Sequence, residues 1–118
     1  MQYLLMAMET PDAFAARTDP ERSGPYWQAW SDYIEALAAS GVMAAAAGLQ
    51  GPDVATTVRV QADRRILHDG PFADAKEHLG GYFVIDVETL DDALAWAERC
   101  PAATYASVEV RPFLPPRP

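Results

Sequence analysis

Two amphipathic helix patterns, each between two strand patterns, most constrain what this chain can fold into. In the first helix pattern, about residues 25–40, Tyr26, Trp30, Tyr33 and Leu37 recur at helical spacing. The second opens at Thr89 as N-cap and stops at Pro101, with Leu90, Ala93, Leu94 and Ala97 as its buried stripe. Residues 2–8, 42–48, 81–87 and 107–112 read as strands, and 56–61 with 64–69 read as a hairpin turning at 62–63. Residues 9–23 read as a long loop, either irregular throughout or with a short helical turn.

The resulting order is β-α-β-β-β-α-β, an α+β domain of ferredoxin-like plan with an added hairpin strand. Its 118 residues fit one domain, which we assign to 1–112, followed by a proline-rich tail at 113–118. Two helices cover one face of a sheet, yet the strand patterns at 2–8 and 81–87 are apolar on both faces. The sequence therefore predicts a homodimer packed face to face, with Arg59 inside a cavity, at the rim of the interface, or simply solvated at a strand edge.

Charge and cysteine content limit the function classes. The net charge of −8 disfavours nucleic acid as a partner, because an acidic surface repels phosphate backbones. The single cysteine, Cys100, cannot form an intrachain disulfide, which fits a reducing compartment. The first residues lack a basic signal region, and their apolar run is too short to cross a membrane. We expect a cytoplasmic protein that binds neither nucleic acid nor membrane.

The segment His68–Gly81, HDGPFADAKEHLGG, concentrates the chemically interesting residues. Asp69-Gly70-Pro71 is a turn signal, so Asp69 is either a structural turn residue or a proton shuttle at a pocket mouth. Glu77 is either solvated or turned inward beside Arg59 or Lys76. The histidines could join Asp69 and Asp74 around a metal, but no known ligand spacing is present and we predict no metal or other cofactor.

Several of these residues, taken together, resemble one family. Asp69-Gly70-Pro71-Phe72, Lys76-Glu77, Leu79-Gly80-Gly81-Tyr82 and the closing Ser107–Pro112 are similar to the DGPF group of YCII-related domain proteins. So are Tyr3-Leu4-Leu5 near the start, and the Gly48-Leu49-Gln50 turn followed by Thr56–Arg59. The resemblance implies a dimeric α/β-barrel with a pocket near the DGPF segment, and some relatives are encoded beside sigma factors. It names no reaction.

The leading hypothesis is a protein that binds a small polar or aromatic molecule near residues 68–81. Cofactor-free acid–base catalysis would rest on Asp69, helped by Glu77 and His68. The candidate ligand-binding residues are Phe72, Lys76, Arg59 and His78. The alternative is a non-enzymatic regulatory or interaction module in a sigma-factor pathway, with a purely structural DGPF turn.

Overall fold

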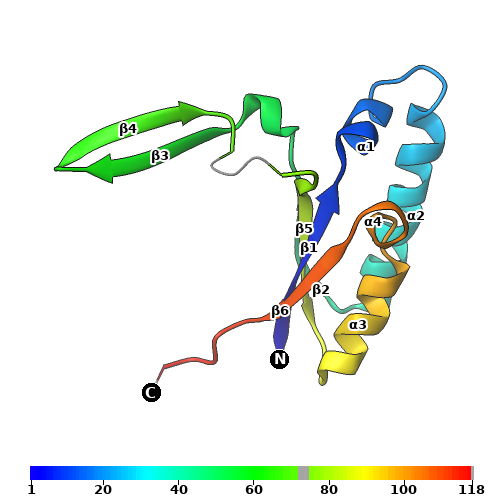
Figure 1. Ribbon diagram of the computed structural model, residues 1–118. Helices are drawn as coiled ribbons and strands as arrows, with labels where there is room; N and C mark the ends of the chain where they lie inside the picture. The colour runs from blue at the N-terminus through cyan, green and yellow to red at the C-terminus, as the bar shows by residue number, and fades with distance from the viewer. Residues whose placement is uncertain (72–74, 118) are drawn as a thin grey trace.

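The computed structural model spans the 118 residues and describes residues 1–71 and 75–117 (Figure 1). The elements within these ranges follow in chain order: β1 (Gln2–Glu9), α1 (Pro11–Ala16), α2 (Ser23–Ser40), β2 (Met43–Gly48), the 3-10 turn η1 (Pro52–Val54), β3 (Thr56–Gln61), β4 (Arg64–Asp69), β5 (His78–Asp86), α3 (Leu90–Arg99), α4 (Ala102–Tyr105) and β6 (Val108–Pro112). The mixed α+β prediction is confirmed, with the hairpin β3–β4 at the predicted residues.

Among the described residues, one sheet has four strands in the order β2-β5-β1-β6, and every neighbouring pair is antiparallel. The chain runs from β1 through α1 and α2 to β2, and from β5 through α3 and α4 to β6. Each crossover skips one strand, which is a split β-α-β connection. The helices lie on one side of this sheet (Figure 1).

The core forms where the helices meet the sheet. Along β1, Tyr3, Leu5 and Ala7 are buried and alternate with half-buried residues, as expected for a strand with one covered face. Leu5 packs with Ile85 of β5 and Leu37 of α2 in one apolar cluster. Each such fully buried aliphatic side chain contributes roughly 1.5–3 kcal/mol.

Local signals explain where the two long helices begin and end. The C-cap of α2 is Gly41, whose φ of 81° suits glycine far better than other residues. Thr89 caps α3 in a reciprocal arrangement with Asp92: the Thr89 hydroxyl accepts from the Asp92 N–H at 3.1 Å, and the Asp92 carboxylate accepts from the Thr89 N–H at 3.3 Å. The predicted N-cap at Thr89 is therefore confirmed.

The short helical turn allowed for within the loop at residues 9–23 is α1, whose first turn is capped by the Thr10 hydroxyl accepting from the Ala13 N–H at 3.1 Å. Two other local predictions were wrong. The strand β5 starts at His78 rather than residue 81. The short helix α4 follows Pro101, where no further helix was expected. In each case a proline or glycine was taken to interrupt structure that it in fact begins or permits.

The hairpin β3–β4 leaves the body on the side of the sheet away from the helices (Figure 1). Its two turn residues, Ala62 and Asp63, have φ of 48° and 62°. Positive φ at both central positions is the mark of a type I′ turn, whose twist matches that of the flanking strands. The face of the main sheet on this side carries the half-buried Leu4, Met6 and Met8 of β1.

Candidate functional site

A buried carboxylate ends the covered face of β1. Glu9 continues the alternation of buried residues along this strand and is 1% exposed. A carboxylate in such a place is costly unless hydrogen bonds replace the water that it has lost. Two tyrosine hydroxyls donate these bonds: Tyr26 of α2 to Oε2 at 3.0 Å and Tyr105 of α4 to Oε1 at 2.5 Å. Both crossovers of the fold thus contribute one donor to Glu9.

The two tyrosines stay protonated as a result. Burial raises the pKa of Tyr26, and the neighbouring Glu9 charge acts in the same direction, while a hydrogen bond from Arg17 opposes it. Burial also raises the pKa of Tyr105 strongly, and its bond to Glu9 adds to the effect. Ionising either hydroxyl would place a second negative charge against the carboxylate.

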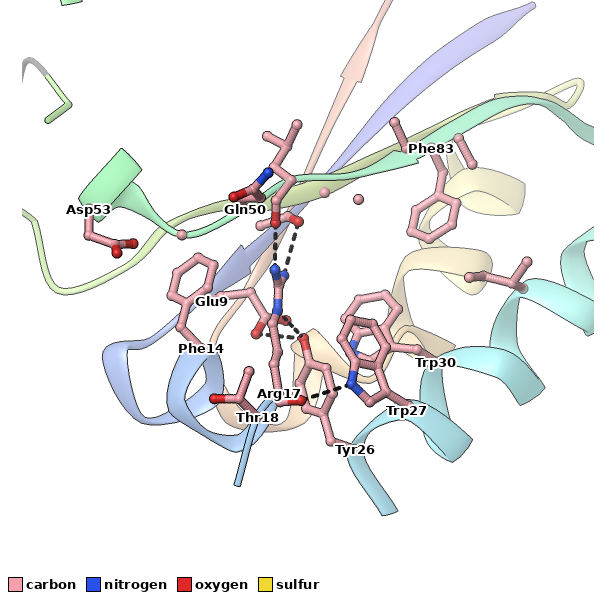
Figure 2. A pocket seen from close by; sticks show the side chains of 18 residues that line it. Glu9, Phe14, Arg17, Thr18, Tyr26, Trp27, Trp30, Gln50, Asp53 and Phe83 are labelled. Carbon is pink, nitrogen blue, oxygen red and sulfur yellow. Dashed lines mark hydrogen bonds between the residues drawn. The ribbon is translucent and has the colours of Figure 1, made fainter. Parts of the chain in front are cut away.

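Arg17, just after α1, joins this group to the loop that follows β2 and to strand β5. Its Nε donates to the Tyr26 hydroxyl at 3.0 Å, Nη1 donates to the Leu49 carbonyl at 2.5 Å and Nη2 donates to the Gly80 carbonyl at 3.2 Å. The guanidinium carbon lies 4.8 Å from the centre of the Phe14 ring and 5.7 Å from that of Trp27. These rings hold a cation that faces Glu9 through one tyrosine hydroxyl (Figure 2).

The glycine pair of the sequence segment makes room for this arrangement. A Cβ on Gly80 would stand 2.2 Å from Cγ of Glu9 and 3.2 Å from Nη2 of Arg17. A Cβ on Gly81 would stand 3.0 Å from the Ala47 carbonyl oxygen across the β2–β5 pair. The side chain of the buried Glu9 thus comes close at Gly80, and the backbone of β2 comes close at Gly81.

A cavity of about 810 Å³ opens beside these groups. Aromatic side chains make much of its wall, with Glu9, Arg17 and Asp53 as charged groups and Gln50 also at its boundary (Figure 2). The full lining is Glu9, Phe14, Arg17, Thr18, Tyr26, Trp27, Trp30, Ile34, Ala46, Ala47, Gly48, Leu49, Gln50, Gly51, Asp53, Gly80, Gly81 and Phe83. We call this space the Glu9 cavity.

Trp30 and Trp27 differ in their roles at the cavity wall. Trp30 is 9% exposed and stacks on Phe83 with ring centres 6.2 Å apart, so it belongs to the apolar core. Its buried indole N–H forms no hydrogen bond within the described part of the chain. Burial raises the pKa of Tyr105, and the nearby Trp30 indole N–H lowers it by a smaller amount. Trp27 is about half exposed, and its N–H donates to the Arg17 carbonyl at 3.1 Å.

The residues predicted from the sequence lie apart from this cavity. His68 and Asp69 end β4 and are exposed, and Arg59 is exposed on β3. Lys76 is exposed as well. Phe72 lies outside the described residues. None of the described ones among them is in the cavity lining.

Glu77 and His78 come nearer to it. Glu77 is half-buried and accepts a hydrogen bond from the Ser107 hydroxyl at 2.5 Å, which ties the start of β5 to the start of β6. His78 is the register partner of Glu9 across the β1–β5 pair. Gly70, with a φ of 92°, supplies the backbone freedom expected at the DGPF turn. The segment thus divides between the hairpin base and the cavity end of β5.

Sequence reasoning missed the four residues that form the polar centre, namely Glu9, Arg17, Tyr26 and Tyr105, as candidates for function. One signal was present. Tyr3, Leu5, Ala7 and Glu9 share one face of the first strand by period two, so an acid stands in line with core residues. Arg17 fell in an expected loop, and nothing local marks Tyr105.

The described residues, which exclude 72–74 and 118, hold neither a cluster of metal ligands nor a membrane-spanning helix. No group of three or more His, Cys, Asp or Glu residues there comes together as a metal site. Asp74 of the metal hypothesis lies outside that range. Within the same residues, no helix is both long and apolar enough to span a membrane.

The chain matches one family and one protein by sequence. The model of the YCII-related domain matches residues 1–115, so the chain belongs to the YCII-related domain family. An uncharacterised protein of Rhizobium meliloti (strain 1021) is 40% identical over 83 residues. That match covers 69% of this chain and 64% of the relative, so it leaves about a third of the relative unmatched. The finer DGPF assignment stays a prediction.

A solved structure shares the fold over almost the whole chain. It is 5-chloro-2-hydroxyhydroquinone dehydrochlorinase from Burkholderia phenoliruptrix AC1100, in complex with 2,5-dihydroxybenzoquinone. The TM-score is 0.57 at 16% identity, with 97% of this chain and 94% of that chain covered. At this identity the likeness concerns the fold.

Proposed function

We propose that this protein binds a small planar aromatic molecule bearing oxygen substituents in the Glu9 cavity. The observation that carries the proposal is a buried, doubly hydrogen-bonded carboxylate at the boundary of an aromatic-walled cavity of about 810 Å³. Ligand sites are typically apolar clefts of this size with a few convergent polar groups. Phe14, Trp27 and Phe83 supply flat apolar surface for a ring.

The polar groups favour oxygen on that ring. A guanidinium has five N–H donors, and the contacts of Arg17 with described residues use three of them. The remaining donors suit a carbonyl or an ionised hydroxyl, whereas the Glu9 carboxylate accepts from a hydroxyl that is still protonated. A ring that carries a carbonyl or ionised hydroxyl next to a protonated hydroxyl can therefore accept from Arg17 and donate to Glu9 at the same edge.

The structural neighbour is compatible with this ligand class. That structure is a complex with 2,5-dihydroxybenzoquinone, a ring with hydroxyl and carbonyl oxygens. The shared fold supports small-molecule binding here, and the choice of an oxygenated aromatic rests on the residues of this chain.

Acid–base chemistry without a cofactor remains part of the proposal. The sequence assigned it to Asp69, with Glu77 and His68, and those roles stay predictions. Glu9 is the carboxylate that we add, since it borders the cavity and holds two hydroxyl protons by hydrogen bonds. The homodimer, the ferredoxin-like barrel and the cytoplasmic location also stay proposals, and binding in the Glu9 cavity depends on none of them.

Calorimetric titration with 2,5-dihydroxybenzoquinone tests the proposal. We expect saturable binding to the unaltered protein and about tenfold weaker binding to Trp27→Ala, which removes a stacking surface worth roughly 1–1.5 kcal/mol. Leu94→Ala is the control, since Leu94 is exposed to a similar degree on α3 and does not border the cavity. Equal affinity of the two variants, or no binding by the unaltered protein to this ring or to simpler hydroxylated benzenes, would contradict the proposal.

A further inference from the structure

The two ends of the Glu9 cavity differ in polarity. Its charged side chains are Glu9, Arg17 and Asp53, which come from the end of β1, the C-cap of α1 and the turn η1. Trp30 and Phe83 stand together toward the other end (Figure 2). A ligand that satisfies both ends therefore carries its oxygen atoms on one edge and apolar surface on the opposite edge.

The apolar end extends along helix α2. Tyr26, Trp30 and Ile34 follow one another at a spacing of four residues, and all three border the cavity. Eight helical residues span about 12 Å, and the Tyr26 hydroxyl at the start of this row donates to Glu9. Ile34 therefore marks the far end of the cavity, away from the carboxylate. Its side chain is 40% exposed, so it has surface that a ligand can cover.

The strand pair β2–β5 changes in the same direction. Gly48 lies opposite Gly81, and Ala46 lies opposite Phe83 two residues further from the polar end, a distance of about 7 Å along the strands. The Phe83 ring is nearly parallel to that of Trp30, with 12° between the two planes. Flat rings and a small side chain thus bound the far end, and such walls suit a flat apolar group.

The cavity is larger than one aromatic ring requires. Its volume is about 810 Å³. A cavity of roughly 150 Å³ is enough to bind benzene, and sites of about 300–1,000 Å³ hold drug-sized ligands. A single hydroxylated ring placed at Glu9 and Arg17 therefore leaves the Ile34 end to water.

We infer that the ligand of the Glu9 cavity is a fused two-ring aromatic molecule, with neighbouring oxygen atoms on the edge that meets Glu9 and Arg17. Its second ring lies against Trp30 and Ile34. The second ring narrows the ligand class of the proposed function, on which this inference rests. A fused ring also loses little conformational freedom on binding, whereas a flexible chain of the same size loses more.

Calorimetric titration of three ligands with the same two neighbouring hydroxyls tests the second ring. Catechol has one ring, 2,3-dihydroxynaphthalene adds four carbons as a fused ring, and 4-butylcatechol adds four carbons as a flexible chain. We expect dihydroxynaphthalene to bind about tenfold more tightly than catechol, because roughly 60 Å² of further apolar surface is buried. The butyl chain should gain about threefold, because it is ordered on binding and cannot stack.

The outcomes separate the second ring from the proposed function. If none of the three ligands binds, the proposed function fails and the second ring fails with it. If catechol and dihydroxynaphthalene bind equally well, or if the butyl chain gains as much as the fused ring, the second ring alone is overturned. Binding of an oxygenated ring in the Glu9 cavity would then still stand.

A pair of variants tests the place of the second ring. In Ile34→Ala, we expect the preference for dihydroxynaphthalene over catechol to fall to about threefold, because apolar surface at the far end is removed. Leu94→Ala is the control, since Leu94 is 45% exposed on α3 and does not border the cavity, and its preference should stay at about tenfold. Equal preferences in the two variants would overturn the contact with Ile34.

Isotope-labelled isoleucine methyl groups give a direct view of the same contact. The isoleucines of the chain are Ile34, Ile66 and Ile85. Ile66 is on β4 and Ile85 is in the core, and neither borders the cavity. We expect nuclear Overhauser contacts between the Ile34 methyl group and the ring protons of dihydroxynaphthalene that lie farthest from its hydroxyls. Contacts of Ile34 only with the protons beside the hydroxyls, or contacts with Ile66 in place of Ile34, would overturn the inference.

Discussion

The cavity end of the sheet and the hairpin β3–β4 place polar and apolar side chains in opposite environments. At the cavity end, a charge is buried and its hydrogen bonds come from distant parts of the chain, such as Tyr26 and Tyr105. In the hairpin, apolar Val58 and Leu67 are exposed, and among the described residues its two strands pair only with each other. A charge held inside at a cost points to chemistry within the chain, whereas apolar surface left outside points to a partner.

Gly80→Ala is the change with the largest expected effect on this contrast. The added Cβ would meet Cγ of Glu9 at 2.2 Å, close to the backbone of a buried residue that cannot swing away. We expect a loss of about 2–3 kcal/mol in the free energy of unfolding, measured in denaturant, together with loss of ligand binding.

Gly24→Ala is the matched control, because a Cβ there meets nothing within 4 Å near the start of α2. It should leave stability equal or raise it by up to about 0.5 kcal/mol. If the two alanines had similar effects, the crowding at Glu9 would not be what requires glycine at position 80.

Tyr105→Phe comes next. It removes the hydroxyl that donates to Oε1 of the buried Glu9, and a lost hydrogen bond to a charged group costs about 1.5 kcal/mol or more. Tyr33→Phe is the comparison, since that hydroxyl donates to the neutral Trp96 carbonyl and its loss costs about 1 kcal/mol. Thermal unfolding of both variants should show the larger drop for Tyr105→Phe; the reverse order would mean that Glu9 gains little from its tyrosines.

Ala62→Gly should have the smallest effect on stability, and this effect should be confined to the hairpin β3–β4. Alanine at a φ of 48° is strained, and glycine relieves this at a gain of about 0.5–1 kcal/mol. Hydrogen exchange should slow at the amides of β3 and β4 and remain unchanged at those of β1 and β5. Equal slowing of hydrogen exchange in the main sheet would mean that the hairpin and the main sheet open as one unit, and would contradict a hairpin held only by local contacts.

The sequence predicted elements better than it predicted the site. Periodicity placed α2, α3 and the hairpin because each pattern is local and long, and Thr89 marked its helix by a reciprocal cap. The alternation of buried residues along β1 continues to Glu9. The predicted strand ended at residue 8, so Glu9 was assigned to the following loop and not to the buried face. Short helices such as α1 and α4 carry too few residues for a periodic signal.

The site could not be predicted by the same means, because its members meet only through tertiary contacts. Arg17 reaches carbonyls 32 and 63 residues further along the chain, and no local pattern encodes such a partner. Glycine and proline made residues 68–81 conspicuous, although Gly80 serves the cavity and Gly70 the hairpin base. Conspicuous turn chemistry is a guide to backbone demands more than to reacting groups.

The central claim is that ligands bind at the Glu9 cavity, and the indole N–H signals of the three tryptophans test it in one nuclear magnetic resonance titration. Trp27 and Trp30 border the cavity, whereas Trp96 on α3 does not and serves as an internal control. With 2,5-dihydroxybenzoquinone added, we expect saturable shifts at Trp27 and Trp30 and none at Trp96. Saturable binding that leaves Trp27 and Trp30 unmoved while shifting the side-chain signals of His68 would contradict it.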